Sequence, residues 1–206
     1  MSFAPDTRVA LQAAAALVNT AGDRRRDGVD RLVDVDDLDR FYAANGFAGR
    51  HDRDAAELAA VRGVRDRVRR LWDVPRDEAA GLVNAMLLEA DARPWLVRHD
   101  GWDWHLHATP MDAPLPVRIL TEAAMAVVDV VRSGEYDRMR VCGAPGCSAV
   151  LVDLSRNRSR RFCDVNNCAN RLHVQAFRER RSRAADAHGA PASTSTDVAP
   201  GAGADG

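Results

Sequence analysis

Hydrophobic residues recur every three or four positions along most of the chain up to residue 134. This spacing places apolar side chains on one face and is typical of amphipathic helices that cover a core. Asp36 and Asp54 suit helix N-caps, whereas Gly46 and Gly134 suit helix ends. The pattern predicts helices over the following segments: 9–20, 36–46, 54–72, 77–92 and 115–132.

The period changes from helical to alternating just before the last of these helices. Trp102, Trp104 and Leu106 alternate with polar residues, which is the pattern of a strand with one apolar and one polar face. Asp100 and Gly101 lie between two short runs and are typical of a type I′ hairpin turn. We therefore expect one β-hairpin in an otherwise helical domain.

The charge of the chain is unevenly distributed. The 206 residues include 29 Lys+Arg and 30 Asp+Glu, and every basic residue is Arg. Residues 140–183 hold 10 arginines against 3 acidic residues, whereas residues 1–139 are mildly acidic. A basic block of this kind is typical of nucleic-acid binding. Residues 184–206 are rich in Ala, Gly, Ser and Thr without an apolar period, which predicts a disordered tail.

No apolar run approaches the roughly 18 residues that cross a membrane. Residues 1–6 lack the basic and then apolar order of a signal peptide. We therefore expect a cytoplasmic protein without membrane contact. In that compartment two structural disulfides would be unusual, which matters for the four cysteines of the chain.

All four cysteines lie in the basic block with the spacing Cys142-x4-Cys147-x15-Cys163-x4-Cys168. Two close pairs of thiolates can supply the tetrahedral ligand set that Zn2+ requires. Two disulfides and unligated core thiols are the alternatives, whereas a thioredoxin-type redox pair would need Cys-x-x-Cys. Four thiolates close the coordination shell, so the predicted zinc ion has a structural and not a catalytic role.

The residues around the cysteines predict the fold of this metal site. Residues 149–152 are typical of a strand, 155–158 of a turn and 160–162 of a returning strand, with a helix from about Cys168. The tight turn between Cys142 and Cys147 (a zinc knuckle), the hairpin and the helix, in this order, form a treble clef. The predicted fold class is a mainly α N-terminal domain with a β-hairpin (α+β), followed by a small treble-clef-like zinc finger. The expected boundaries of domain, finger and tail are 1–139, 140–183 and 184–206.

Two segments, DLSRNRSRRFC at 153–163 and CANR at 168–171, carry a family pattern. With the paired cysteines they make residues 142–181 resemble the CGNR zinc finger, although Ala169 stands where that family usually has Gly. Upstream, ALVNT at 16–20 and a hairpin followed by an Ala-rich helix resemble the ABATE domain. That domain commonly precedes a CGNR finger in bacterial proteins proposed to be stress-induced transcription regulators. The resemblance implies a ligand-sensing domain ahead of a DNA-binding finger.

The arginines of the basic block suit contacts with DNA. On a helix, Arg171 and Arg178 share one stripe, which can face the phosphate backbone. Asn170 or Gln175 can read adenine, although phosphate contacts are the commoner kind. Some arginines must serve the fold, and docking on the acidic N-terminal domain is the alternative. The DNA-binding residues we expect are Arg156, Arg158, Arg160, Arg161, Asn170, Arg171, Gln175, Arg178 and Arg181.

Candidate ligand-binding residues in the N-terminal domain are fewer. Asn19 and Thr20 end an apolar helix, where polar groups can face a pocket for an unknown small molecule. The alternative is that they only cap the helix or start a turn. His105 and His107 are two residues apart on one strand, and such a pair can chelate a metal, but no third ligand is identifiable.

These features favour a DNA-binding regulator and not an enzyme. Treble-clef nucleases need histidines on the hairpin and helix, whereas this hairpin has none and His173 is alone on the helix. RNA recognition usually adds stacking aromatics, and Phe162 and Phe177 are both candidates for the core. A protein-interaction finger without DNA binding is the alternative. Because one small finger binds DNA weakly, the sequence is compatible with a homodimer.

Overall fold

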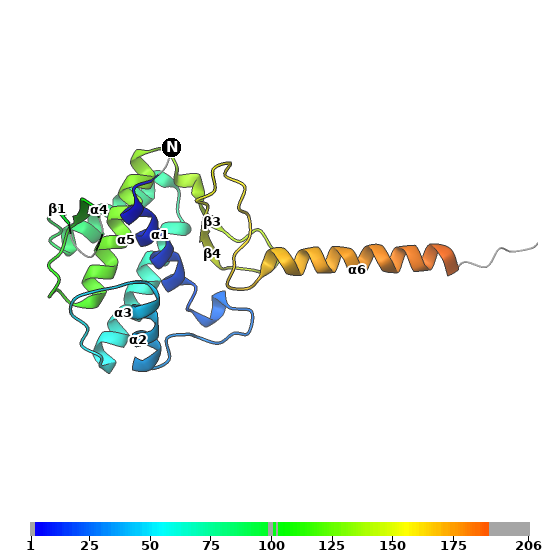
Figure 1. The fold of residues 1–206 in the computed structure, drawn as a ribbon, viewed down its shortest axis with the longest axis horizontal. Coiled ribbons are helices and arrows are strands. Elements are labelled where there is room, and N and C mark those ends of the chain that lie inside the picture. Colours follow the sequence, from blue (N-terminus) through cyan, green and yellow to red (C-terminus); the bar gives the residue numbers. More distant parts are fainter. Residues whose placement is uncertain (1–2, 99–100, 102, 190–206) are drawn as a thin grey trace, which may run out of the picture. The chain divides into compact units, whose positions relative to one another are not determined.

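The structure is a computed structural model that describes residues 3–98, 101 and 103–189 (Figure 1). Its α-helices are α1 (Pro5–Val18), α2 (Val35–Ala44), α3 (Ala55–Arg69), α4 (Arg76–Glu89), α5 (Leu115–Arg132) and α6 (Cys168–Gly189). Its strands are β1 (Trp95–Val97), β2 (His105–His107), β3 (Met139–Val141) and β4 (Val150–Val152). Short 3-10 helices are η1 (Gly22–Arg24), η2 (Arg70–Trp72) and η3 (Tyr136–Arg138). The chain divides into two units, residues 1–169 and 170–206.

Aspartates fix the start of two helices. Asp54 accepts a hydrogen bond from the backbone N–H of Glu57 at 2.7 Å, so α3 begins where the sequence predicted. The prediction that Asp36 caps α2 is wrong, because the helix begins slightly earlier. There the side chain of Asp34 accepts a hydrogen bond from the N–H of Asp37 at 2.8 Å. Each carboxylate satisfies an N–H that the first helical turn leaves without a backbone partner.

The core of the first unit is built around α5, which packs against α1, α3 and α4. Leu115 and Val130 of α5, Leu11 of α1 and Val61 of α3 are all fully buried. Burying one such side chain contributes about 1.5–3 kcal/mol to folding, before the entropy of ordering is counted. The mainly helical N-terminal domain that the apolar period predicted is therefore confirmed.

The predicted hairpin of this domain is also present, formed by β1 and β2. The strands are antiparallel, with Trp95 opposite His107. The predicted turn residue Asp100 and the side chain of Trp102 lie outside the described residues. The apolar face of the hairpin is turned to solvent, since Trp104 is 64% exposed. The histidine face is the half-buried one.

A second hairpin, β3–β4, belongs to the zinc finger and corrects one prediction. Strand β4 pairs with the upstream β3, with Met139 opposite Val152, and not with 160–162. The predicted returning strand is wrong because the buried carboxylate of Asp153 accepts a hydrogen bond from the backbone N–H of Arg160 at 2.9 Å. This contact holds the intervening residues as a compact loop. All three residues of β4 are buried, and the strand packs on α1.

Helix α6 begins at Cys168, as the sequence predicted. It continues to Gly189 and so extends past residue 184, where the predicted disordered tail was expected to begin. The rest of that tail, 190–206, lies outside the described residues. Its arginines lie between Arg171 and Arg183, in the part of the helix before residue 184.

Candidate zinc centre and basic surface

Four thiols converge at the end of the β3–β4 hairpin. Cys142 follows β3 and Cys147 precedes β4, so both lie in the hairpin turn. Cys163 lies in the loop after β4, and Cys168 is the first residue of α6. The four Sγ atoms all lie within 4.8 Å of one another. All four thiols are free in the structure, an arrangement that favours a metal site over disulfides.

Glycines shape the turn between the first two cysteines. Gly146 has φ of +69°, a left-handed conformation that favours glycine. A Cβ atom on Gly143 would lie 3.3 Å from the carbonyl oxygen of Arg161. The backbone N–H of Gly143 donates to that same carbonyl at 2.8 Å. The two loops that carry the thiols are thus joined through their backbones.

The donor set fits zinc. The Sγ atom of Cys163 is 3.7 Å from that of Cys147 and 3.7 Å from that of Cys168. A tetrahedral ion with Zn–S bonds of about 2.3 Å has S–S edges of about 3.8 Å. Burial raises the pKa of Cys163 to about 11, so a central cation is needed to hold all four sulfurs as thiolates. Four thiolates leave no open position for a catalytic water.

Asn166 supports the cluster from the second Cys-x4-Cys segment. Its Nδ2 donates to the Sγ of Cys147 at 3.4 Å and to the carbonyl of Arg24 at 2.8 Å. Its Oδ1 accepts a hydrogen bond from the backbone N–H of Arg26 at 3.0 Å. Burial opposes ionisation of Cys147, but hydrogen bonds from Asn166 and the backbone of Ala149 outweigh it and lower the pKa of this thiol to about 7. Asn166 therefore ties the metal centre to the N-terminal domain.

This link brings a second basic segment, the arginine run 24–26, beside the zinc centre. Ser148, next to the second cysteine, strengthens the link by donating from Oγ to the carbonyl of Asp23 at 2.8 Å. Arg26 is exposed in this position. Neither the run nor Asn166 was among the site residues predicted from the sequence. The three consecutive arginines were visible, but only the folded chain shows that they lie beside the cysteines.

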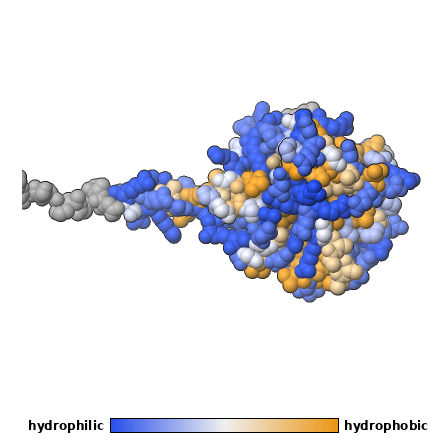
Figure 2. All heavy atoms as spheres, turned by 180° about the vertical axis from the view of Figure 1, so that it is seen from behind, coloured by the Kyte–Doolittle hydropathy of each residue, from blue (hydrophilic) through white to orange (hydrophobic). Residues whose placement is uncertain are grey.

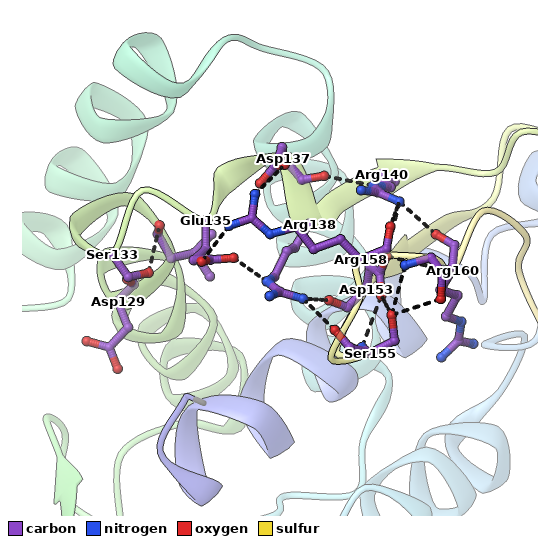
Figure 3. A network of polar contacts seen from close by, with 12 residues as sticks. Asp129, Ser133, Glu135, Asp137, Arg138, Arg140, Asp153, Ser155, Arg158 and Arg160 are labelled. Carbon is purple, nitrogen blue, oxygen red and sulfur yellow. Dashed lines mark hydrogen bonds and ion pairs between the residues drawn. The ribbon is translucent and has the colours of Figure 1, made fainter. Parts of the chain in front are cut away.

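A polar network orders the loop after β4 (Figure 3). Asp153 is completely buried, and its carboxylate accepts hydrogen bonds from the backbone N–H groups of Ser155 at 3.0 Å and Arg160 at 2.9 Å. The guanidinium of Arg140 pairs with the same carboxylate at 3.0 Å. Arg138 donates to the carbonyl oxygens of Asp153 and Ser155 at 2.8 and 2.9 Å. These contacts hold the loop arginines on a fixed backbone.

Two of the predicted DNA-binding arginines in this loop bind other parts of the protein. Arg158 forms ion pairs with Glu135 at 2.7 Å and with Asp137 at 3.1 Å (Figure 3). Its hydrogen bond to Glu135 and the two neighbouring carboxylates raise its pKa above the usual arginine value. Arg160 pairs with Asp164. These contacts give both residues a role in the fold.

The other two loop arginines, Arg156 and Arg161, are exposed. Neither side chain makes a hydrogen bond or ion pair with any other described residue. Gln175 donates to Glu179 at 2.9 Å, and the guanidinium of Arg181 lies 5.9 Å from the ring centre of Phe177. The surface of α6 is mainly hydrophilic (Figure 2). Its predicted DNA-binding residues are all exposed, namely Asn170, Arg171, Gln175, Arg178 and Arg181.

The two predicted ligand-binding residues, Asn19 and Thr20, are buried and bonded within the protein. Asn19 donates from Nδ2 to the carbonyl of Val150 and accepts from the N–H of Val150, both at 2.8 Å. Thr20 donates to the carbonyl of Leu17 at 2.6 Å and accepts from Arg65 at 3.3 Å. Neither residue lines the cavity of about 190 Å3 that opens between α1, α5 and β2.

A helical domain joined to a site of four free thiols defines a zinc-finger protein. Residues 11–134 match the family model ABATE, described as "Putative stress-induced transcription regulator". Residues 138–181 match the CGNR zinc finger. The chain therefore belongs to the ABATE family and carries a zinc-binding CGNR finger, as the sequence predicted.

Neither of these families is an enzyme family. No curated protein matches the chain significantly. Among the described residues, no helix combines the length and the apolar character needed to span a bilayer.

Proposed function

We propose that the protein is a transcription regulator that binds DNA through its four-cysteine finger and is modulated by a small molecule bound to the N-terminal domain. The observation that carries DNA binding is the exposure of Arg156 and Arg161 on a loop ordered by Asp153. Arginines without an internal partner are available for phosphate oxygens, and a fixed loop loses little entropy on binding. The exposed arginines of α6 supply further guanidinium donors.

The arginine run 24–26 supports the same function. Asn166 holds this run beside the zinc centre, so a phosphate backbone that reaches the finger can also meet Arg26, the exposed arginine of the run. The contact area then exceeds that of the finger alone, which compensates for the weak binding expected of one small module.

The test compares two double variants of the zinc-loaded full chain on random-sequence duplex DNA. Arg156→Ala with Arg161→Ala removes the two exposed loop charges. Arg76→Ala with Arg93→Ala removes the same charge from exposed positions in the N-terminal domain. We expect the first variant to lower the slope of log affinity against log salt by about 1 for each lost phosphate contact. Equal binding by both variants would contradict the proposal.

Modulation by a ligand is supported by the two ends of α1. Near its start, Thr7, Ala10 and Ala13 line the cavity. Directly after its end, Asn19 holds Val150 of β4 through two hydrogen bonds. A ligand that shifts α1 would therefore move the strand that precedes the finger loop. The readout is a change in DNA affinity on adding the ligand, abolished by Asn19→Ala.

A protein-interaction module without DNA binding is the second candidate. It is favoured by apolar side chains that remain exposed on α6, since Phe177 is 50% and Val174 37% exposed. Exposed apolar residues of this kind suit a protein partner. Zinc-loaded protein that binds no duplex DNA at low salt would favour this candidate.

We also infer a cytoplasmic location and action as a homodimer. Four free thiols persist in a reducing compartment, which supports the location. Two fingers on adjacent half-sites would supply the contacts that one finger lacks, which supports the dimer. Light scattering of the protein–DNA complex tests the stoichiometry, and one chain per site would contradict it.

A further inference from the structure

Among the described residues, the lining of the cavity between α1, α5 and β2 combines apolar residues with three acidic residues. Ala13, Phe47, Met111 and Met125 contribute apolar surface to its wall. Its volume of about 190 Å3 suits a small organic molecule. Such a wall binds an apolar body through burial of hydrophobic surface, and the polar groups then decide which ligand chemistry is accepted.

Arg118, the one arginine among the described residues that line the cavity, is hydrogen-bonded within the protein. Arg118 is only 3% exposed, and its guanidinium donates to the backbone carbonyls of Ala113, Ala48 and Arg50. Three of its five N–H groups are therefore directed at the protein. Because the side chain is buried, it offers an anionic ligand little accessible surface.

The acidic side chains of the cavity differ in the hydrogen bonds that they accept from the protein. Asp129 accepts a hydrogen bond from the hydroxyl of Thr7 at 2.5 Å, and Asp6 accepts a long one from the N–H of Leu106 at 3.4 Å. Glu122 makes no hydrogen bond or ion pair with any other described residue. Glu122 lines the cavity and is exposed, but the surrounding protein desolvates its carboxyl more strongly than the charge of Arg118 compensates, and this raises its pKa to about 7. A cation beside Glu122 would compensate that desolvation.

The two histidines of β2 do not make the cavity lining positive, since its described residues include three acidic ones. The Nε2 atoms of His105 and His107 lie 3.1 Å apart, so one ring must donate and the other accept. The pair therefore carries at most one positive charge while this contact is made. Among the described residues, only the four cysteines form a cluster of three or more metal-binding side chains, so a metal ion here lacks a ligand set.

We propose that this cavity binds a small organic amine, with its ammonium group at Glu122 and its aliphatic or aromatic body against the apolar wall. The inference rests on the proposed function, because it names the ligand class of the modulating domain. An ammonium group offers charged N–H donors to the carboxylates. A neutral hydroxyl of the same shape offers only an uncharged donor, and an anionic carboxylate is repelled.

The test uses matched probes on the zinc-loaded full chain without DNA: phenethylamine, its neutral analogue 2-phenylethanol and the anion phenylacetate. Titration calorimetry is expected to show at least about tenfold tighter binding of the amine than of either analogue, a difference of about 1.4 kcal/mol. Glu122→Gln is expected to remove that preference while retaining the fold, because the side chain has solvent access. Glu78→Gln, an exposed carboxylate on α4, is expected to retain it.

Several outcomes would overturn the assignment. They are equal binding of the three probes, preference for phenylacetate, no amine binding at millimolar concentration, or unchanged selectivity in Glu122→Gln. A cavity-filling variant, Ala10→Leu, provides a second check, since it should weaken the amine and the alcohol alike. DNA affinity with and without amine is measured separately. Amine binding without an effect on DNA would retain the ligand class and contradict only the modulation.

Discussion

Single residues in the finger loop separate structural from functional arginines. Arg158 pairs with Glu135, whose carboxylate is itself mostly buried. Arg156 is two positions away in sequence but is exposed and unpaired within the described chain. The sequence shows both as members of one basic motif. Only the position of Glu135, far upstream in sequence, distinguishes them.

This difference predicts opposite phenotypes for two substitutions of the same type. Arg158→Ala should lower the free energy of unfolding, because Glu135 loses an ion-pair partner. It should leave the phosphate contacts of the exposed loop arginines intact. Arg156→Ala should leave unfolding within about 0.5 kcal/mol of wild type and weaken DNA binding. Urea unfolding and fluorescence anisotropy on duplex DNA measure the two effects. Stability loss in Arg156→Ala with no loss in Arg158→Ala would contradict the assignment.

At the scale of elements, the helices were predictable because their signal is local. The apolar period and the cap at Asp54 involve residues within a few turns of each other. The partner of β4 was not predictable in the same way, since strands of three residues have little pattern and pairing is set by the folded loop. The four thiols were predictable from their spacing, whereas the contact of Asn166 with Arg24 depends on the tertiary fold.

The junction between α1 and β4 gives an element-scale prediction. Asn19→Ala removes both hydrogen-bonding partners of the buried Val150 backbone. Leaving two buried backbone groups unsatisfied should cost on the order of 3 kcal/mol of unfolding free energy. Thr20→Val tests the neighbouring position as a comparison, because its hydroxyl bonds only Leu17 and Arg65.

Hydrogen exchange locates the effect of Asn19→Ala. The amide of Val150 should exchange faster in this variant, while amides in α4 should change little. Unchanged exchange at Val150 would show that the junction is not held by Asn19.

For the unit formed by residues 1–169, the zinc site and the helical core depend on each other. Val150 and Val152 belong to the same buried cluster as Leu17 of α1. Trp72 adds a hydrogen bond from its indole N–H to the carbonyl of Leu151 at 3.1 Å. The finger hairpin therefore contributes to the core that covers α1. The sequence predicted two successive domains and did not indicate that they share this core.

Removal of zinc should consequently destabilise more than the finger. Chelation is expected to lower the melting temperature of the helical domain and to speed amide exchange in α1, because β4 loses its anchor at Cys147. Restoring zinc should reverse both effects. Exchange changes confined to 142–168, with an unaltered melting temperature, would contradict this coupling.

DNA binding by the finger is tested most directly by the affinity of the zinc-loaded full chain for random-sequence duplex DNA across a salt series. Zinc content is determined on the same sample. A DNA-binding zinc-finger regulator should contain one zinc ion per chain, its log affinity should fall steeply and linearly against log salt, and chelation should abolish the binding. One zinc ion per chain with no DNA binding, even at low salt, would contradict a DNA-binding regulator and leave the finger as a protein-docking module.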